Sequence, residues 1–298
     1  MKVVDPHMHL CNFNQINYPW LRRPNDQWLL GPYSSIAKEY LLDDFLNSSG
    51  EIEVTKIVHI ENGPCASDRL TETRWLQTIV DDSSSRGRPN GSVAGVDLSQ
   101  PDIELQLKQH CESRIVRGVR QILNAHADPH FDFVGRHYMQ EPTWLTGFAL
   151  LRRFNLSFDL QIYPSQMQEA TNLAAQHPDV QLILNHTGMF VDRTTVNGWR
   201  GWRDGIRQLS KQENVAVKIS GMGMLDHKWT VESIRPYVLE TIDCFGVNRT
   251  MFASNFPVDG LYATYEATWH AFADCIAGMN DGEKEQMFRH NAERIYRI

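Results

Sequence analysis

The chain has 298 residues, 42% of them hydrophobic, a size that suits either two domains or one α/β barrel. Its net charge of -7 and its lack of any basic block argue against nucleic acid and anionic membrane surfaces as partners, because phosphate binding needs clustered Lys and Arg. Five cysteines without a Cys-x-x-Cys pair argue against a disulfide framework. The sequence shows neither a signal peptide nor an apolar run near the ~18 residues that a membrane span needs, so we expect a cytoplasmic protein.

Short β-branched runs recur along the chain, and most are followed by a segment with a helical pattern. They cover residues 2–9, 54–61, 92–98, 114–123, 156–163, 180–188, 215–221 and 250–256. Several are almost continuously apolar, which is typical of strands buried on both faces of a parallel sheet. Among the helix signals, Ser99 is expected as an N-cap with Pro101 in the first turn, and Gly246 as a C-cap.

The alternation of strand and helix predicts an α/β fold, with residues 1–298 as one domain, a single closed (β/α)8 barrel of the TIM type. The main rival is an open doubly wound sheet. That fold normally carries a glycine-rich phosphate turn after its first strand, and here the turn is missing.

Residues 10–52, between the first two strands, are far longer than an ordinary βα loop. Residues 35–48 should form a helix, whereas the part before them is rich in Trp, Tyr, Pro and Asn. Loops that follow strands lie at the catalytic face of such a barrel, so we expect this one to cover the site as a wall or lid, the alternative being a packing segment. Trp20, Trp28 and Tyr33 could stack on a substrate ring or simply pack.

Polar residues stand at the carboxyl end of nearly every expected strand, the end that builds the active site in such barrels. A contribution to the stability of the fold would hardly explain polar residues at the ends of all eight strands. The residues are His7, His9, His59, Glu61, Asp97, Arg117, Arg120, Gln121, Asp159, Gln161, His186, Lys218, Ser220, Ser254 and Asn255.

Successive side chains of a strand point to opposite faces, so residues two apart share a face. His7 and His9 point the same way, and so do His59 and Glu61. Two histidines at this spacing can hold one metal ion or can donate hydrogen bonds to one carbonyl oxygen. With His186 across the barrel, a functional site is the favoured interpretation of the pair.

The remaining polar side chains suit a small polar substrate. Arg117 and Arg120 should face opposite ways, and an inward Arg120, together with Lys218, could bind a carboxylate or several hydroxyls. Asp159 and Gln161 suit sugar hydroxyls. Lys218 could equally form an internal salt bridge.

The strand-end motifs resemble those of the amidohydrolase superfamily, in particular its sugar-lactonase and pyrone-dicarboxylate lactonase branch. The motifs are "DPHMH", "LNHTG", "KISG" and "FASNFPVD", joined by "VHIE", "RGVRQIL" and "SFDLQIYPSQM". The resemblance runs from Val3 to Arg297. It implies a (β/α)8 barrel that hydrolyses a lactone of a sugar acid or of an aromatic-degradation intermediate, with a divalent metal that only some members need.

One departure from this resemblance concerns the end of the eighth strand. The superfamily usually places there an aspartate that takes the proton from the attacking water, and this chain has Asn255. A carboxamide cannot act as a general base. The base must then be another carboxylate, with Glu61, Asp159 and Asp259 as candidates. Glu61 could instead bind metal or pair with an arginine, and Asp259 could be a cap.

Opening a lactone needs an aligned water, a base, and donors or positive charge where the oxyanion develops. His7, His9 and His186 could supply the last requirement as donors or as ligands of one divalent metal, with zinc the first candidate. Asn255 leaves metal dependence open. The rival hypotheses are a metal-dependent decarboxylase of the same superfamily and a non-catalytic small-molecule binding barrel. The sequence leaves open which lactone is used and whether the chain forms a homo-oligomer.

Overall fold

The expected β-branched runs form eight strands in a computed structural model that describes residues 1–25 and 27–298. Each strand pairs in parallel with the next one in the chain. The strands are β1 (Lys2–Met8), β2 (Glu53–Ile60), β3 (Gly91–Gly95), β4 (Val116–Ile122), β5 (Ser157–Gln161), β6 (Leu182–Leu184), β7 (Val215–Ile219) and β8 (Thr250–Phe252).

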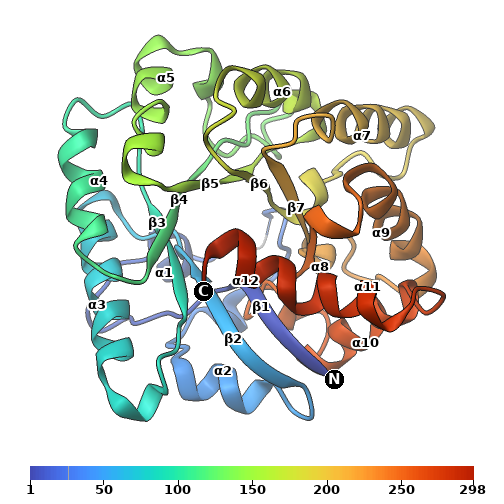
Figure 1. The fold of residues 1–298 in the computed structure, drawn as a ribbon, viewed down its shortest axis with the longest axis horizontal. Coiled ribbons are helices and arrows are strands. Elements are labelled where there is room, and N and C mark those ends of the chain that lie inside the picture. The colour runs from blue at the N-terminus through green and yellow to red at the C-terminus, as the bar shows by residue number, and fades with distance from the viewer. Residues whose placement is uncertain (26) are drawn as a thin grey trace.

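The strands follow one another around a ring (Figure 1), and the ring is nearly closed where the segment after β8 meets the end of β1. Met8 forms a parallel bridge with Phe256, and the His9 N–H donates to the Phe256 carbonyl. The Asn255 N–H donates to the His7 carbonyl. The prediction of a (β/α)8 barrel, and not of an open sheet, is therefore confirmed.

Helices follow most of the strands, and most of these helices surround the ring and shield its outer face from water. They are α1 (Pro19–Arg22), α2 (Leu42–Ser48), α3 (Arg69–Asp81), α4 (Ile103–Cys111), α5 (Pro142–Phe148), α6 (Met167–Gln176), α7 (Val196–Leu209), α8 (Met222–Leu225), α9 (Val231–Phe245), α10 (Tyr265–Cys275), α11 (Asp281–Glu285) and α12 (Asn291–Tyr296). Within the described part of the chain, none is long and apolar enough to cross a bilayer.

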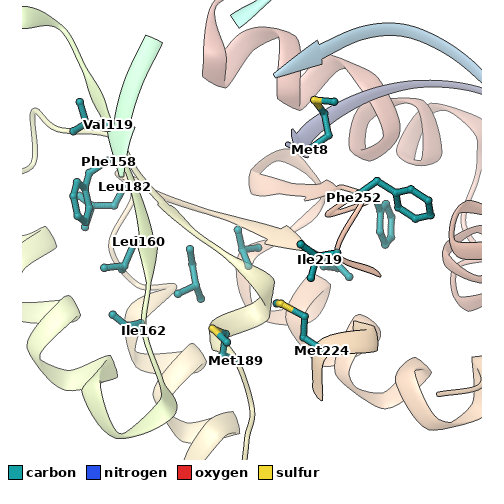
Figure 2. Packing of buried hydrophobic residues seen from close by; sticks show 14 of the residues in the cluster. Met8, Val119, Phe158, Leu160, Ile162, Leu182, Met189, Ile219, Met224 and Phe252 are labelled. Atoms are coloured by element: carbon teal, nitrogen blue, oxygen red, sulfur yellow. The ribbon is translucent and has the colours of Figure 1, made fainter. Parts of the chain in front are cut away.

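Two apolar clusters form the core. The larger lies between strands and helices and includes Phe158, Leu182 and Phe252 (Figure 2). The smaller fills the barrel, where side chains from six strands meet residues of α12: Val4, Val58, Ile60, Val93, Ile183, Ala216, Met251, Ala292, Ile295 and Tyr296. Helix α12 lies near the centre of the ring in Figure 1, so the C-terminal segment closes the end of the barrel opposite the strand carboxyl ends.

Two helix boundaries differ from the predictions. Helix α4 begins at Ile103 and not near Ser99, because the Asp97 carboxylate binds both the N–H and the hydroxyl of Ser99 and holds a turn there. Helix α2 begins only at Leu42, seven residues after the expected start, because Ser34–Ile36 form a separate 3-10 turn and Tyr40 pairs with Cys11. Gly246 does end α9, as expected, with φ +72°.

The long first loop folds back over the carboxyl ends of the strands. Cys11 and Tyr40 pair as an antiparallel bridge with N–H···O distances of 2.8 and 3.0 Å, which closes the loop at its base. Trp20 and Trp28 from this loop line the cavity described below, which confirms the expected wall. Tyr33 is buried and donates to the Trp20 carbonyl, so it packs beneath the wall.

Candidate active site

A cavity of about 300 Å³ lies at the carboxyl ends of the strands, beneath the long first loop. Its polar lining comes from strand ends, and its apolar lining comes from loops and strand ends. The polar residues are His9, Asn62, Arg120, Gln161, His186 and Asn255. The other lining residues are Trp20, Trp28, Leu29, Leu30, Gly63, Ile122, Phe133, Met189, Met224 and Val258.

The three histidines named from the sequence lie together at this end of the barrel. The ring centroid of His7 is 5.0 Å from that of His9 and 4.5 Å from that of His186. A bulge between Asp5 and Met8 places one extra residue in β1 and reverses its alternation, so His7 shares the inner side with Val4. His7 is fully buried below the cavity, and neither ring nitrogen has a hydrogen-bond partner among the described residues.

The backbone fixes the protonation of the His9 ring. Nδ1 lies 2.8 Å from the Ile60 carbonyl, which can only accept, so Nδ1 carries the proton and Nε2 keeps its lone pair. Nε2 lies 3.3 Å from the side-chain oxygen of Asn255, and the Nδ2 of this carboxamide has no hydrogen-bond partner among the described residues. The contact is favourable when the carboxamide presents its N–H to Nε2. Burial, followed by the charge of Arg120, holds the pKa of His9 well below its usual value, so the ring is neutral.

His186 begins a turn of unusual backbone conformation. Its φ is +54°, and the next three residues have φ values of +51°, +78° and +48°. A left-handed conformation is rare for a β-branched residue such as Thr187, and each strained residue costs about 1–3 kcal/mol. The indole N–H of Trp202 donates to the Thr187 carbonyl at 2.7 Å, and His186 Nδ1 lies 2.9 Å from the Ser220 hydroxyl. These contacts hold the imidazole against the cavity.

Gly221 allows His186 to take this position. A Cβ atom at position 221 would lie 2.6 Å from Nδ1 of His186, so any residue with a side chain would clash with the imidazole. The φ of Gly221 is +69°, a backbone conformation that favours glycine. Burial, with the charges of Lys218 and Arg120, holds the pKa of His186 well below its usual value. The ring is therefore neutral at pH 7.

Arg120 faces inward, and Arg117 points outward to the Arg297 carbonyl, as their spacing predicts. The guanidinium donates to the Glu61 carboxylate at 2.7 Å, the Glu61 carbonyl at 2.6 Å and the Gln161 side-chain oxygen at 3.0 Å. The other Glu61 oxygen accepts the Gly63 N–H at 2.8 Å. Glu61 thus has the arginine pairing that the sequence left as an alternative to a role as base or metal ligand.

Asp159 and Lys218, predicted as substrate contacts, form an ion pair inside the barrel. Lys218 Nζ lies 2.8 Å from Asp159 Oδ2, and neither side chain has exposed surface. The Tyr296 hydroxyl, from α12, lies 2.6 and 2.8 Å from the two carboxylate oxygens. Burial, partly opposed by Asp159, lowers the pKa of Lys218 to about 8. Neither residue lines the cavity, and the pair fits the internal salt bridge that was the alternative for Lys218.

Asp259 lies behind Asn255 and not in the cavity lining. Its N–H donates to the Asn255 carbonyl at 3.1 Å. Burial raises the pKa of the Asp259 carboxyl to about 7, although contacts with the Asn255 side chain and with backbone N–H groups near Gly223 oppose the rise. Its position makes it a support for Asn255.

Alternation along β2 predicted one face for His59 and Glu61, and here the prediction was wrong. The strand ends at Ile60, and the chain then turns Glu61 toward Arg120, whereas His59 faces the buried Glu72 of α3 at 3.8 Å. The Leu10 N–H donates to Nδ1 of His59 at 3.0 Å and thereby positions the end of β1. The sequence gives no signal for Glu72, which lies in an ordinary helical pattern.

As they are arranged in this structure, the donors around the cavity do not converge on one point that would hold a metal ion. No group of three His, Cys, Asp or Glu side chains in residues 1–25 and 27–298 gathers in a metal-binding arrangement. The carboxylates Glu61 and Asp159 are held in ion pairs by Arg120 and Lys218 and are not free to bind a metal ion. Divalent metals usually have at least one such carboxylate or a complete set of converging imidazoles.

Comparison with known proteins supports the barrel fold. A family model described as amidohydrolase matches residues 4–298. The protein y4mH of Sinorhizobium fredii (strain NBRC 101917 / NGR234), itself uncharacterised, is 42% identical over 297 residues, covering 99% of this chain and 98% of its own. An L-fucono-1,5-lactonase of Burkholderia multivorans (strain ATCC 17616 / 249) is 24% identical over 276 residues, covering 88% and 84%. The crystal structure of an amidohydrolase from Burkholderia multivorans with bound zinc gives a TM-score of 0.81 at 21% identity over 100% of both chains, which shows a shared fold.

Proposed function

Because the chain belongs to the amidohydrolase family, we propose that it is a hydrolase that opens a lactone ring by attack of water at the carboxyl ends of the barrel strands. The relative named L-fucono-1,5-lactonase supports a cyclic ester as substrate. Lactones of sugar acids and carboxylated lactones are therefore the first substrates to test. The observation that carries the proposal is the pair of neutral imidazoles of His9 and His186, which line one cavity and are each fixed by a different partner.

His9 takes the role of general base. Nε2 keeps its lone pair because Nδ1–H is bound to the Ile60 carbonyl, and the lone pair becomes available when the attacking water takes the place of the Asn255 contact. As the water oxygen attacks the lactone carbonyl carbon, its proton passes to Nε2, and Asn255 orients the water. When the bond from the carbonyl carbon to the ring oxygen breaks, the same proton passes to that oxygen and yields a hydroxy acid.

His186 takes the role of donor to the developing oxyanion. If the Ser220 hydroxyl donates to Nδ1, the other ring nitrogen carries its proton toward the cavity. A neutral donor held in place by a strained backbone requires little rearrangement as charge forms, which is the condition for effective stabilisation of an oxyanion. His7 supports both rings from below.

Hydrolysis of a lactone panel, followed with a pH indicator, tests the proposal. We expect acid release by the native chain, and a fall in kcat of about 100-fold or more in His9→Gln and in His186→Gln, since bases and oxyanion donors each contribute at least that much. The matched control is His270→Gln on the exposed face of α10, which should leave kcat unchanged. Circular dichroism verifies that each variant is folded.

The same assay separates the rival functions. Binding of lactones without turnover would identify a non-catalytic barrel, and release of carbon dioxide from aromatic carboxylic acids would identify a decarboxylase. A divalent metal at His7, His9 and His186 is the second candidate arrangement, favoured by the unpartnered nitrogens of His7 and by the zinc bound to the Burkholderia multivorans amidohydrolase. Activity that survives chelation on metal-analysed protein supports the direct role of the imidazoles, and its loss supports the metal.

A further inference from the structure

One wall of the cavity is aromatic and comes from two loops that are distant in the sequence. Trp28 from the first loop and Phe133 from the segment after β4 have ring centroids 4.7 Å apart, and Trp20 lies 6.2 Å from Trp28. All three side chains are half-buried and line the cavity. Six aliphatic side chains also line the cavity: Leu29, Leu30, Ile122, Met189, Met224 and Val258. A substrate that enters the cavity therefore contacts a large apolar surface as well as the histidines.

The described residues that line the cavity offer no uncompensated positive charge. Among its described lining residues Arg120 is the one permanent cation, and its guanidinium already binds the Glu61 carboxylate and carbonyl and the Gln161 side chain. Lys218, the other buried cation nearby, is paired with Asp159 outside the lining. A carboxylate on the substrate would lose its water without gaining a free counter-ion, which is costly in a buried site.

From these two features we infer that the cavity selects an uncharged lactone with an apolar substituent that packs against Trp28 and Phe133. The inference rests on the proposed function, and it narrows the substrate class. The carbonyl and the ring oxygen would face His9 and His186, with Arg120 and Gln161 left for one or two neutral polar groups. Hydroxyls placed against the aromatic wall would lose hydrogen bonds to water and find no replacement, so a fully hydroxylated ring fits less well.

Four lactones measured side by side test this inference: δ-nonalactone, δ-valerolactone, D-glucono-1,5-lactone and 2-pyrone-4,6-dicarboxylate. Each methylene buried against the wall should raise kcat/KM by up to about fourfold, from a transfer free energy of about 0.8 kcal/mol. The butyl chain of δ-nonalactone should therefore raise kcat/KM over that of δ-valerolactone by at least tenfold. The dicarboxylate should be the poorest of the four.

Two wall variants locate the effect. Trp28→Ala and Phe133→Ala should each lower kcat/KM for δ-nonalactone by about tenfold and leave δ-valerolactone within about threefold. Phe154→Ala, at a half-buried aromatic residue that does not line the cavity, is the matched control and should change neither. A higher kcat/KM for the dicarboxylate or for the gluconolactone than for δ-nonalactone overturns the inference and leaves lactone hydrolysis standing. Hydrolysis of none of the four overturns the proposed function itself.

Discussion

Asp159→Asn distinguishes a structural ion pair from a substrate-binding one. Lys218 Nζ and Asp159 Oδ2 are 2.8 Å apart with no exposed side-chain surface. At an effective dielectric constant of about 20, their attraction is about 6 kcal/mol. Removal of one partner of a buried pair usually costs about 3–5 kcal/mol, since the remaining charge is left without compensation.

The protonation of Lys218 limits this cost. Burial, partly opposed by Asp159, lowers the pKa of Lys218 to about 8, so loss of its proton at pH 7 costs only about 1.4 kcal/mol. In Asp159→Asn the amine should lose its proton and not remain a buried cation. We therefore expect a loss of about 3 kcal/mol, near the lower end of the range. The double variant with Lys218→Met should be more stable than Asp159→Asn alone, because no charge remains to be buried.

Urea unfolding followed by circular dichroism measures these stabilities, and lactone hydrolysis in native buffer measures KM. We expect a lower unfolding midpoint for Asp159→Asn with KM within about threefold of the native value. Lys56→Met, which breaks a partly exposed pair with Glu293, is the control and should cost at most about 1 kcal/mol. An unchanged midpoint together with a KM raised tenfold would refute the structural role and return both residues to the substrate site.

Three further substitutions probe other parts of the site. Burial raises the pKa of Glu72 from 4.5 to about 8, so its neutral form stabilises the fold fully below pH 4.5, and this contribution is lost as pH rises toward 8. In the native chain the free energy of unfolding should therefore fall by up to about 1.4 kcal/mol per pH unit between pH 6 and 8, and Glu72→Gln should remove this fall. A variant whose free energy of unfolding depends on pH as steeply as that of the native chain would contradict the prediction. Trp202→Phe removes the donor to the Thr187 carbonyl and should lower kcat more than it raises KM, whereas a pure loss of stability would leave both constants of the folded enzyme unchanged. Asn255→Asp places a second carboxyl beside Asp259 and should not raise kcat; a large gain in kcat would show that His9 is not the base.

The strands and the location of the site could be predicted because both follow from simple constraints. A parallel barrel needs strands that are apolar on both faces, and such runs are visible directly in the sequence. Its carboxyl ends all meet at one rim, so the polar residues that end the strands must gather there whatever the details of the loops. His9, Arg120, Gln161 and His186 were found in this way.

The sequence could not predict how far along the barrel axis an inward-facing side chain lies, and therefore whether it lines the cavity or is buried below it. Alternation assigns Asp159 and Gln161 to the same inner face, but the structure places Gln161 in the cavity and Asp159 in the interior below it. The partner that completes this lower layer, Tyr296, lies 137 residues further along the chain on α12. A contact of that range leaves no local pattern in the sequence.

Backbone irregularities account for the other differences. The bulge in β1 reverses its alternation before His7, and the left-handed turn at His186 and Thr187 uses residues that rarely adopt it. Pro6 lies in the bulge and Gly188 lies in the turn, but neither residue indicates that β1 gains a residue here or that His186 and Thr187 adopt left-handed conformations. Both features lie at the candidate site, where tertiary contacts such as the Trp202 hydrogen bond stabilise backbone conformations that local propensity disfavours.

Two buried ion pairs explain why the histidines of the candidate site have no unpaired carboxylate beside them, although the chain has a net negative charge. Arg120 neutralises Glu61 and Lys218 neutralises Asp159, so among residues 1–25 and 27–298 no free carboxylate lines the cavity. In the proposed reaction the only new charges are then an oxyanion and an imidazolium, formed together and close to each other, and their attraction is strongest in a cavity without competing ions. An aspartate at position 255 would add a fixed negative charge beside the oxyanion and oppose its formation. The carboxamide of Asn255 keeps the geometry of that position without the charge, and this gives a physical reason for the departure from the usual pattern.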